Sequence, residues 1–173
     1  EKEFALYGLL LENQDPGICY HSIGVNGASV PSYLRCEFFE KQLSLIKPDL
    51  IIFSVGINDA YDTQFTADKY ENNYDTLISY FQKVNPKAAL LFTTNNDSYY
   101  KRKYPNKKAE DVRDVMRKLA YKYGGGVWDM YGLMGGLGSV KTWENAGLAK
   151  RDKIHFTKAG YETVGDLLFE ALI

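Results

Sequence analysis

The chain has 173 residues, of which 45% are hydrophobic, and its formal net charge is −1 at pH 7. This length and composition predict one domain with a sizeable core, and no apolar segment approaches membrane-spanning length. The charge balance argues against a nucleic-acid surface, because the only basic clusters are residues 101–103 and 107–108. We expect these lysines and the arginine among them to form a solvated loop.

The first predicted elements are two strand-like runs. Residues 4–11 form one apolar run, and a second strand starts at Ile18 and runs toward Gly27. Only residues 12–17 connect them, whereas the crossover helix between parallel neighbours needs about a dozen residues or more. Residues 1–14 are therefore interpreted as the end of a preceding β-rich module or an extra strand, and residues 15–173 as the main domain.

Helices and strands alternate over the remaining sequence. A helix begins near Pro31, Gly124 to Gly126 end a later helix, and Thr157 is a predicted N-cap for the last one. Apolar runs predict strands at residues 50–55, 88–94 and 127–131, and apolar stripes at helical spacing predict helices at 70–81, 112–123 and 161–172. The alternation predicts an α/β fold with a parallel sheet, right-handed crossovers and helices on both faces.

A histidine near the C-terminus follows an aspartate at a spacing typical of catalytic loops. In Asp152-x-x-His155, the carboxylate can accept a hydrogen bond from Nδ1 of the imidazole, which leaves Nε2 free to deprotonate a nucleophile. The alternative is a surface aspartate near a structural histidine. The pair is a candidate base with its orienting acid.

Two further candidate residues follow predicted strands. Asn58, in Gly56-Ile57-Asn58-Asp59, comes after strand 50–55, and its amide can donate to an oxyanion or cap the strand. Gly27 follows the strand that starts at Ile18, and its lack of a Cβ allows close approach to its backbone N–H. Ligands of open α/β sheets bind at the carboxyl ends of the strands, where both residues are expected.

Taken in chain order, the segments of Gly27, Asn58 and Asp152-x-x-His155 resemble those of the SGNH hydrolases, also called the GDSL esterase family. The resemblance extends from about residue 18 to residue 172. The resemblance implies a flavodoxin-like three-layer αβα sandwich and a serine ester hydrolase that needs no metal or organic cofactor. It implies that His155 is the base, Asp152 orients it, and Gly27 and Asn58 donate to the oxyanion.

Residues 134–136 (Met-Gly-Gly) and Trp143 resemble a stretch of those family members that act on acetylated polysaccharides. The implied reaction removes O-acetyl groups from peptidoglycan or another polysaccharide, and the implied location is periplasmic or secreted. The implied partners are a small-molecule or polysaccharide ester and no nucleic acid. Which acyl group and which sugar are bound is left open, as is the oligomeric state.

The family's nucleophile has no match in this sequence. It lies in a Gly-Asp-Ser segment after the first strand, so we expect the chain to be the C-terminal part of a longer protein whose missing N-terminal segment supplies that strand and the serine. Ser98 lacks the preceding glycine, Ser29 is interpreted as a helix cap, and Ser54 is expected to be buried in mid-strand. The alternative function is a carbohydrate-binding pseudoenzyme that lacks the nucleophile.

The missing strand would lie between the second and third strands of the family's sheet. Its absence would leave backbone groups unpaired, at a cost of about 1–3 kcal/mol for each buried group, so the isolated chain is expected to be unstable or prone to aggregation.

Two other patterns in the sequence concern phosphate and metal binding. Residues 135–142 resemble a phosphate loop, but Val140 replaces its second glycine, and residues 143–147 are a poor candidate for the helix that should follow. Cys19 and Cys36 belong to no Cys/His cluster, so a metal site is not expected, and a disulfide between them is left open.

Overall fold

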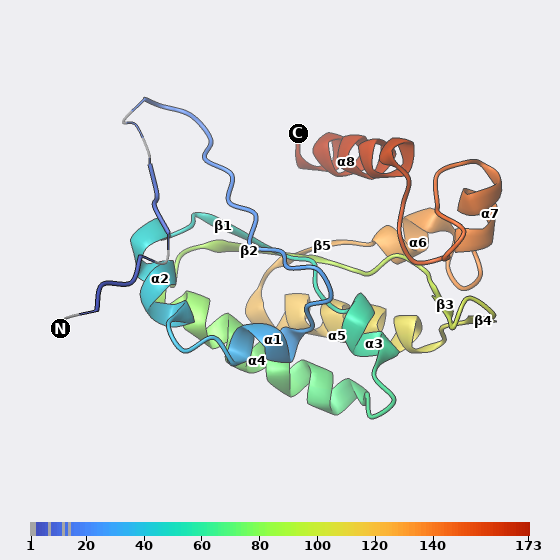
Figure 1. Ribbon diagram of the computed structural model, residues 1–173, viewed down its shortest axis with the longest axis horizontal. Helices are drawn as coiled ribbons and strands as arrows, with labels where there is room; N and C mark the ends of the chain where they lie inside the picture. Colours follow the sequence, from blue (N-terminus) through green and yellow to red (C-terminus); the bar gives the residue numbers. More distant parts are fainter. Residues whose placement is uncertain (1–2, 7, 12, 14) are drawn as a thin grey trace.

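The computed structural model describes residues 3–6, 8–11, 13 and 15–173. A three-stranded parallel sheet lies at its centre, with β2 (Ala89–Thr93) between β1 (Leu50–Phe53) and β5 (Gly126–Trp128) (Figure 1). Phe53 of β1 stands opposite Phe92 of β2, and their rings stack at 5.1 Å between centroids. Because the strands are parallel, their carboxyl ends meet at one edge of the sheet.

Long helices cover one face of this sheet. Helices α4 (Ala67–Val84) and α5 (Lys108–Tyr123) pack against it and each other, with α1 (Val30–Leu34) and α2 (Phe39–Ile46) beside α4. Their apolar stripes form the main core, which includes the buried side chains of Tyr70, Tyr74, Ile78, Val112, Met116 and Leu119. Gly124 ends α5 in the left-handed conformation, at φ 65°.

Helix α8 (Lys158–Leu172) lies on the opposite face (Figure 1). Thr157 is its N-cap, as predicted, because the Thr157 hydroxyl accepts a hydrogen bond from Gly160 N. Gly160 is the one residue of α8 that is buried, and Phe169 is 64% exposed. This second helical layer therefore leaves much of its face of the sheet uncovered.

The shorter elements follow the carboxyl ends of the strands. Helix α3 (Ile57–Tyr61) follows β1, and the hairpin of β3 (Tyr99–Tyr100) and β4 (Tyr104–Pro105) follows β2. Helices α6 (Met130–Met134) and α7 (Val140–Asn145) follow β5. None of the helices in the described part of the chain is both long and apolar enough to cross a membrane.

The α/β fold with a parallel sheet and helices on both faces is confirmed, but the strand predicted from Ile18 is wrong. Residues 18–25 lie outside any strand, and Ile18 is 100% and Val25 70% exposed. In the part of the chain that the structure describes, β1 is the edge strand on that side of the sheet, and residues 18–25 are not part of the sheet. A segment becomes a strand only when its backbone groups pair with those of a neighbouring strand. The described residues of the run at 4–11 form no strand either, and residues 1–2, 7, 12 and 14 lie outside the described part.

Three smaller expectations are also corrected. The strand predicted at 127–131 ends at Trp128, because Asp129 accepts a hydrogen bond from Gly132 N and starts α6. Ser54 is exposed, since alternate residues of β1 point away from the α4 and α5 layer toward the uncovered face. Residues 143–145, a poor helix candidate in sequence, lie in α7.

Candidate active site

The aspartate and the histidine of the Asp-x-x-His segment form a hydrogen-bonded pair. His155 Nδ1 lies 2.9 Å from Asp152 Oδ2, and Asp152 Oδ1 accepts bonds from Ile154 N and His155 N, each at 3.0 Å. Lys150 N donates to His155 O at 2.8 Å, which closes the loop around the pair. The three bonds to Asp152 fix both the carboxylate and the ring, whose side chain remains 52% exposed.

These bonds also set the charge of the carboxylate. Partial burial raises the pKa of Asp152, but the hydrogen bonds from His155 N, His155 Nδ1 and Ile154 N outweigh it, so the pKa lies below its ordinary value. The carboxylate is therefore ionised at neutral pH and holds the proton of His155 on Nδ1. Nε2 is left as the nitrogen that can accept a proton.

Asn58 and the loop of Gly27 lie together after the end of β1. Asn58 is exposed in the first turn of α3, and its Nδ2 donates to Ala28 O at 2.9 Å. Gly27 has φ +76°, a conformation that favours glycine, in a turn closed by a 3.0 Å bond from Ala28 N to Val25 O. Because a primary amide has two N–H groups, one remains for a substrate oxygen.

Buried groups fix the turn that carries Asn58. A Cβ on Gly56 would lie 2.2 Å from Tyr70 Oη and 2.9 Å from Asn95 Nδ2, so no larger residue fits there. Asp59 is 7% exposed, and both of its carboxylate oxygens lie 3.2 Å from Val30 N at the start of α1. Burial raises the pKa of Asp59 to about 6, against the opposing effect of the bond from Val30 N.

No role was predicted for Asp59, although its position in the first turn of a helix is one that favours a carboxylate. In the structure, the Asp59 carboxylate accepts the Val30 N–H and so connects α3 to α1.

Residues after β2 connect α3 to the loop that carries Asp152 and His155, which we call the dyad. Asn96 Nδ2 donates to Ile154 O at 3.0 Å, and Tyr99 N donates to Lys153 O at 3.0 Å. On the other side, Tyr61 of α3 donates its hydroxyl to Tyr99 O. The predicted base and the predicted oxyanion donors therefore lie at the same edge of the sheet, and their convergence beside Nε2 stays a prediction. Sequence reasoning missed Asn96 and Tyr61, whose partners are far away in the chain.

The serines of the described chain do not complete this arrangement. Ser98 is 1% exposed, and Ser29 is the N-cap residue of α1, with its N–H donating to Ser32 Oγ at 3.2 Å. Among the described residues no serine hydroxyl bonds to His155.

A metal or phosphate site finds little support in the described residues. They contain no group of three or more His, Cys, Asp or Glu side chains that could hold a metal ion. The glycine-rich loop at 135–138 leads into α7, but Asp97 Oδ2 accepts the Val140 N–H of this helix at 2.9 Å. A carboxylate thus occupies the position that a bound phosphate would need. The structure joins Cys19 and Cys36 by no disulfide.

The parallel sheet flanked by helices is that of the SGNH hydrolases, and the Asp–His pair lies at the carboxyl edge of this sheet. Residues 6–163 match the model of the GDSL-like lipase/acylhydrolase family, and the chain belongs to this family. Its fold and family are those of carboxylic ester hydrolases. No curated protein matches the chain.

Solved structures of esterases share the fold. A peptidoglycan O-acetylesterase matches with a TM-score of 0.81 at 24% identity, over 87% of this chain and 45% of the other. An acetyl xylan esterase, AlAXEase, matches with a TM-score of 0.66 at 24% identity, over 87% and 79%. A lipase/acylhydrolase from Enterococcus faecalis matches with a TM-score of 0.66 at 21% identity, over 84% and 71%. This chain thus spans less than half of the peptidoglycan O-acetylesterase.

Proposed function

We propose that this chain carries the base, the orienting acid and the oxyanion donors of a serine esterase that removes O-acetyl groups from a carbohydrate. The observation that carries the proposal is the 2.9 Å bond between His155 Nδ1 and Asp152 Oδ2 at the carboxyl edge of the sheet. The family of the chain and the printed activities of two structural neighbours, one a peptidoglycan O-acetylesterase and one an acetyl xylan esterase, support the choice of an acetyl ester.

The reaction follows from the roles of these groups. A serine hydroxyl attacks the ester carbonyl while Nε2 of His155 takes its proton, and the ionised Asp152 stabilises the imidazolium that forms. The N–H of Gly27 and the second N–H of Asn58 Nδ2 donate to the oxyanion. The imidazolium then protonates the leaving sugar alkoxide, and a water molecule, activated by the same nitrogen, releases acetate. No metal or organic cofactor takes part.

We place the nucleophile in a segment outside this chain. Strand β1 is an edge strand of the described sheet, and residues 18–25 are exposed and belong to no strand. The face of the sheet below α8 is also uncovered, as the exposure of Ser54 and Phe169 shows. One further strand would pair with β1 and bring a Gly-Asp-Ser segment to the carboxyl edge of the sheet, and its crossover helix would cover the exposed face. A periplasmic or secreted location would suit such a substrate.

Covalent labelling tests this proposal. A fluorophosphonate should label the complete protein, with any segment that precedes Glu1, on a single serine outside the 173 residues. His155→Ala should suppress the labelling, because serine is a weak nucleophile without its base, and His21→Ala should leave it unchanged. An adduct on Ser98 or Ser54 would refute the placement of the nucleophile. No adduct on the folded complete protein would favour a carbohydrate-binding pseudoenzyme.

A further inference from the structure

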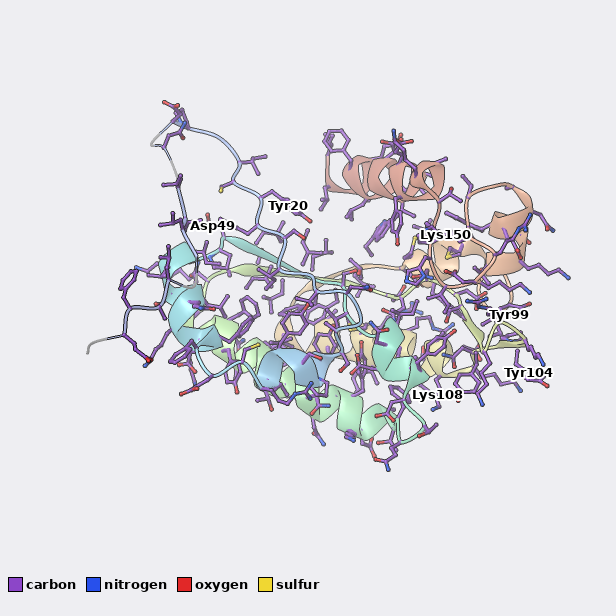
Figure 2. The ribbon with its side chains drawn as sticks, viewed as in Figure 1. Tyr20, Asp49, Tyr99, Tyr104, Lys108 and Lys150 are labelled. Atoms are coloured by element: carbon purple, nitrogen blue, oxygen red, sulfur yellow. The ribbon has the colours of Figure 1, made fainter. Side chains whose placement is uncertain are left out.

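The β3–β4 hairpin and the dyad loop together form a strongly basic surface. We call this surface the basic edge, and it consists of six residues from two segments: Lys101, Arg102, Lys103, Lys150, Arg151 and Lys153. All but Lys153 are exposed. Figure 2 shows Tyr99, Tyr104 and Lys150 in the right-hand half of the molecule and Asp49, which precedes β1, in the left-hand half. The basic edge therefore lies at the carboxyl ends of the strands, with the candidate active site.

The hairpin turn holds its cations in an unusual backbone conformation. A bond of 3.1 Å from Lys103 N to Tyr100 O closes the turn, and its two central residues have positive φ, 51° at Lys101 and 61° at Arg102. Such turns favour Asn-Gly, because other side chains are strained there. The turn does not require a Lys-Arg pair at these positions; Lys101 Nζ lies 5.4 Å from the centroid of the Tyr100 ring, and both side chains are exposed to solvent.

The hairpin is fixed to the loop of the dyad. Tyr99 N donates to Lys153 O at 3.0 Å, and Lys153 Nζ donates back to Arg102 O at 3.4 Å. The same ammonium group lies 4.7 Å from the centroid of the Tyr99 ring. Because Lys153 directly follows Asp152 in sequence, these contacts place the hairpin turn next to the loop that carries the base.

No carboxylate neutralises the basic edge within the described residues. Elsewhere in the chain, Lys83, Lys118 and Lys122 form ion pairs at 2.7 to 3.0 Å, but none of the six residues of the basic edge does. The adjacent Asp152 is engaged by His155 and two backbone N–H groups. A local positive potential therefore stands beside the candidate active site of a chain whose net charge is −1.

We propose that the basic edge binds the carboxylate groups of an acidic polysaccharide and so presents its acetyl ester to His155. This inference rests on the proposed esterase function and narrows its substrate class. Lysine and arginine bind carboxylates through charge-assisted hydrogen bonds. The ring of Tyr104 on β4, 65% exposed, offers a face on which a sugar can stack. The basic area is confined to one end of the molecule, which fits spaced carboxylates better than a continuous phosphate backbone.

The test compares the complete wild-type protein with a hairpin variant in which Lys101, Arg102 and Lys103 are all replaced by Gln. The kcat/KM is measured on an O-acetylated uronic-acid oligosaccharide and on an O-acetylated xylo-oligosaccharide of equal length. The wild type should prefer the acidic substrate at low salt, and the preference should fall by roughly tenfold in the hairpin variant. It should also fall in about 0.5 M salt, where charges are screened within a few ångströms.

A matched control removes the same charge elsewhere. Lys41, Lys47 and Lys87 are exposed, and the last two precede β1 and β2 at the opposite edge of the sheet. Replacing these three by Gln should leave the preference at its wild-type value. Equal preferences in the hairpin variant and the wild type would overturn the proposal, as would equal losses in the hairpin and control variants.

Direct binding separates this inference from the esterase function. Fluorescence anisotropy with a labelled, unacetylated oligogalacturonate needs no turnover, and the hairpin variant should bind it about tenfold more weakly than the control variant at low salt. If the wild type cleaves no acetyl ester but this difference is found, the esterase function fails and the acidic-glycan surface stands. Unchanged binding in the hairpin variant would overturn the surface. Tighter binding of a single-stranded oligonucleotide of equal charge would replace the polysaccharide with nucleic acid.

Discussion

The buried carboxyl of Asp59 makes the stability of this protein depend on pH in a direction opposite to that of most aspartates. Its side chain is 7% exposed beneath the turn that carries Asn58, and burial raises its pKa from 3.8 to about 6. In the unfolded chain the carboxyl titrates at its ordinary value. The folded protein therefore binds the Asp59 proton more tightly than the unfolded chain does.

The sign and size follow from this difference. Between about pH 4 and pH 6 the folded state holds more protons than the unfolded state, so the free energy of unfolding falls as the pH rises and is constant above that range. A shift of about two pKa units corresponds to about 3 kcal/mol of unfolding free energy. Asp59→Asn removes the titrating group, so the stability of the variant relative to wild type should rise by about 3 kcal/mol between about pH 4 and pH 7.

Denaturant unfolding of the complete protein at several pH values measures this change. Asp59→Asn also changes the acceptor of Val30 N, but that loss does not depend on pH once the wild-type carboxyl is ionised, so the slope of the comparison isolates the titration. Asp49→Asn is the control, because Asp49 is exposed. Parallel stability curves for wild type and Asp59→Asn would refute the reasoning.

Three further predictions concern the site and its support. His155→Ala should abolish nearly all turnover of a small acetyl ester by the complete protein, whereas His21→Ala should retain it; equal rates for wild type and His155→Ala would remove the assignment of the base. Asn58→Ala should lower kcat about 10²–10³-fold with less effect on KM, because the amide contact strengthens as the oxyanion forms, and a change in KM alone would contradict that role. Gly160→Ala should lower the thermal midpoint by several degrees in calorimetry, since its Cβ would lie 1.9 Å from Leu148 O; an unchanged midpoint would show that the loop before α8 can move aside.

Local patterns in the sequence were sufficient for most of the elements and for the dyad. The stripe of Tyr70, Tyr74 and Ile78 predicted one face of α4, and these side chains are buried in the core. The Asp152–His155 bond also follows from the sequence, because both residues and the N–H groups that fix them lie within one short loop. Such features depend on helical periodicity and on contacts between near neighbours, which the order of residues alone determines.

The tertiary structure decided everything that depends on a distant partner. Helix α7 forms after a glycine-rich loop because Asp97, 43 residues before Val140, accepts its first N–H. The bond from Asn96 to Ile154 spans 58 residues and brings the dyad to the edge where Asn58 lies. The apolar run from Ile18 has the composition of a strand, but a strand must pair with a neighbour to satisfy its backbone groups, and the described sheet ends at β1 without including this run. Composition and periodicity show which segments can pair or be buried, whereas pairing and burial themselves require a second surface that the local sequence does not contain.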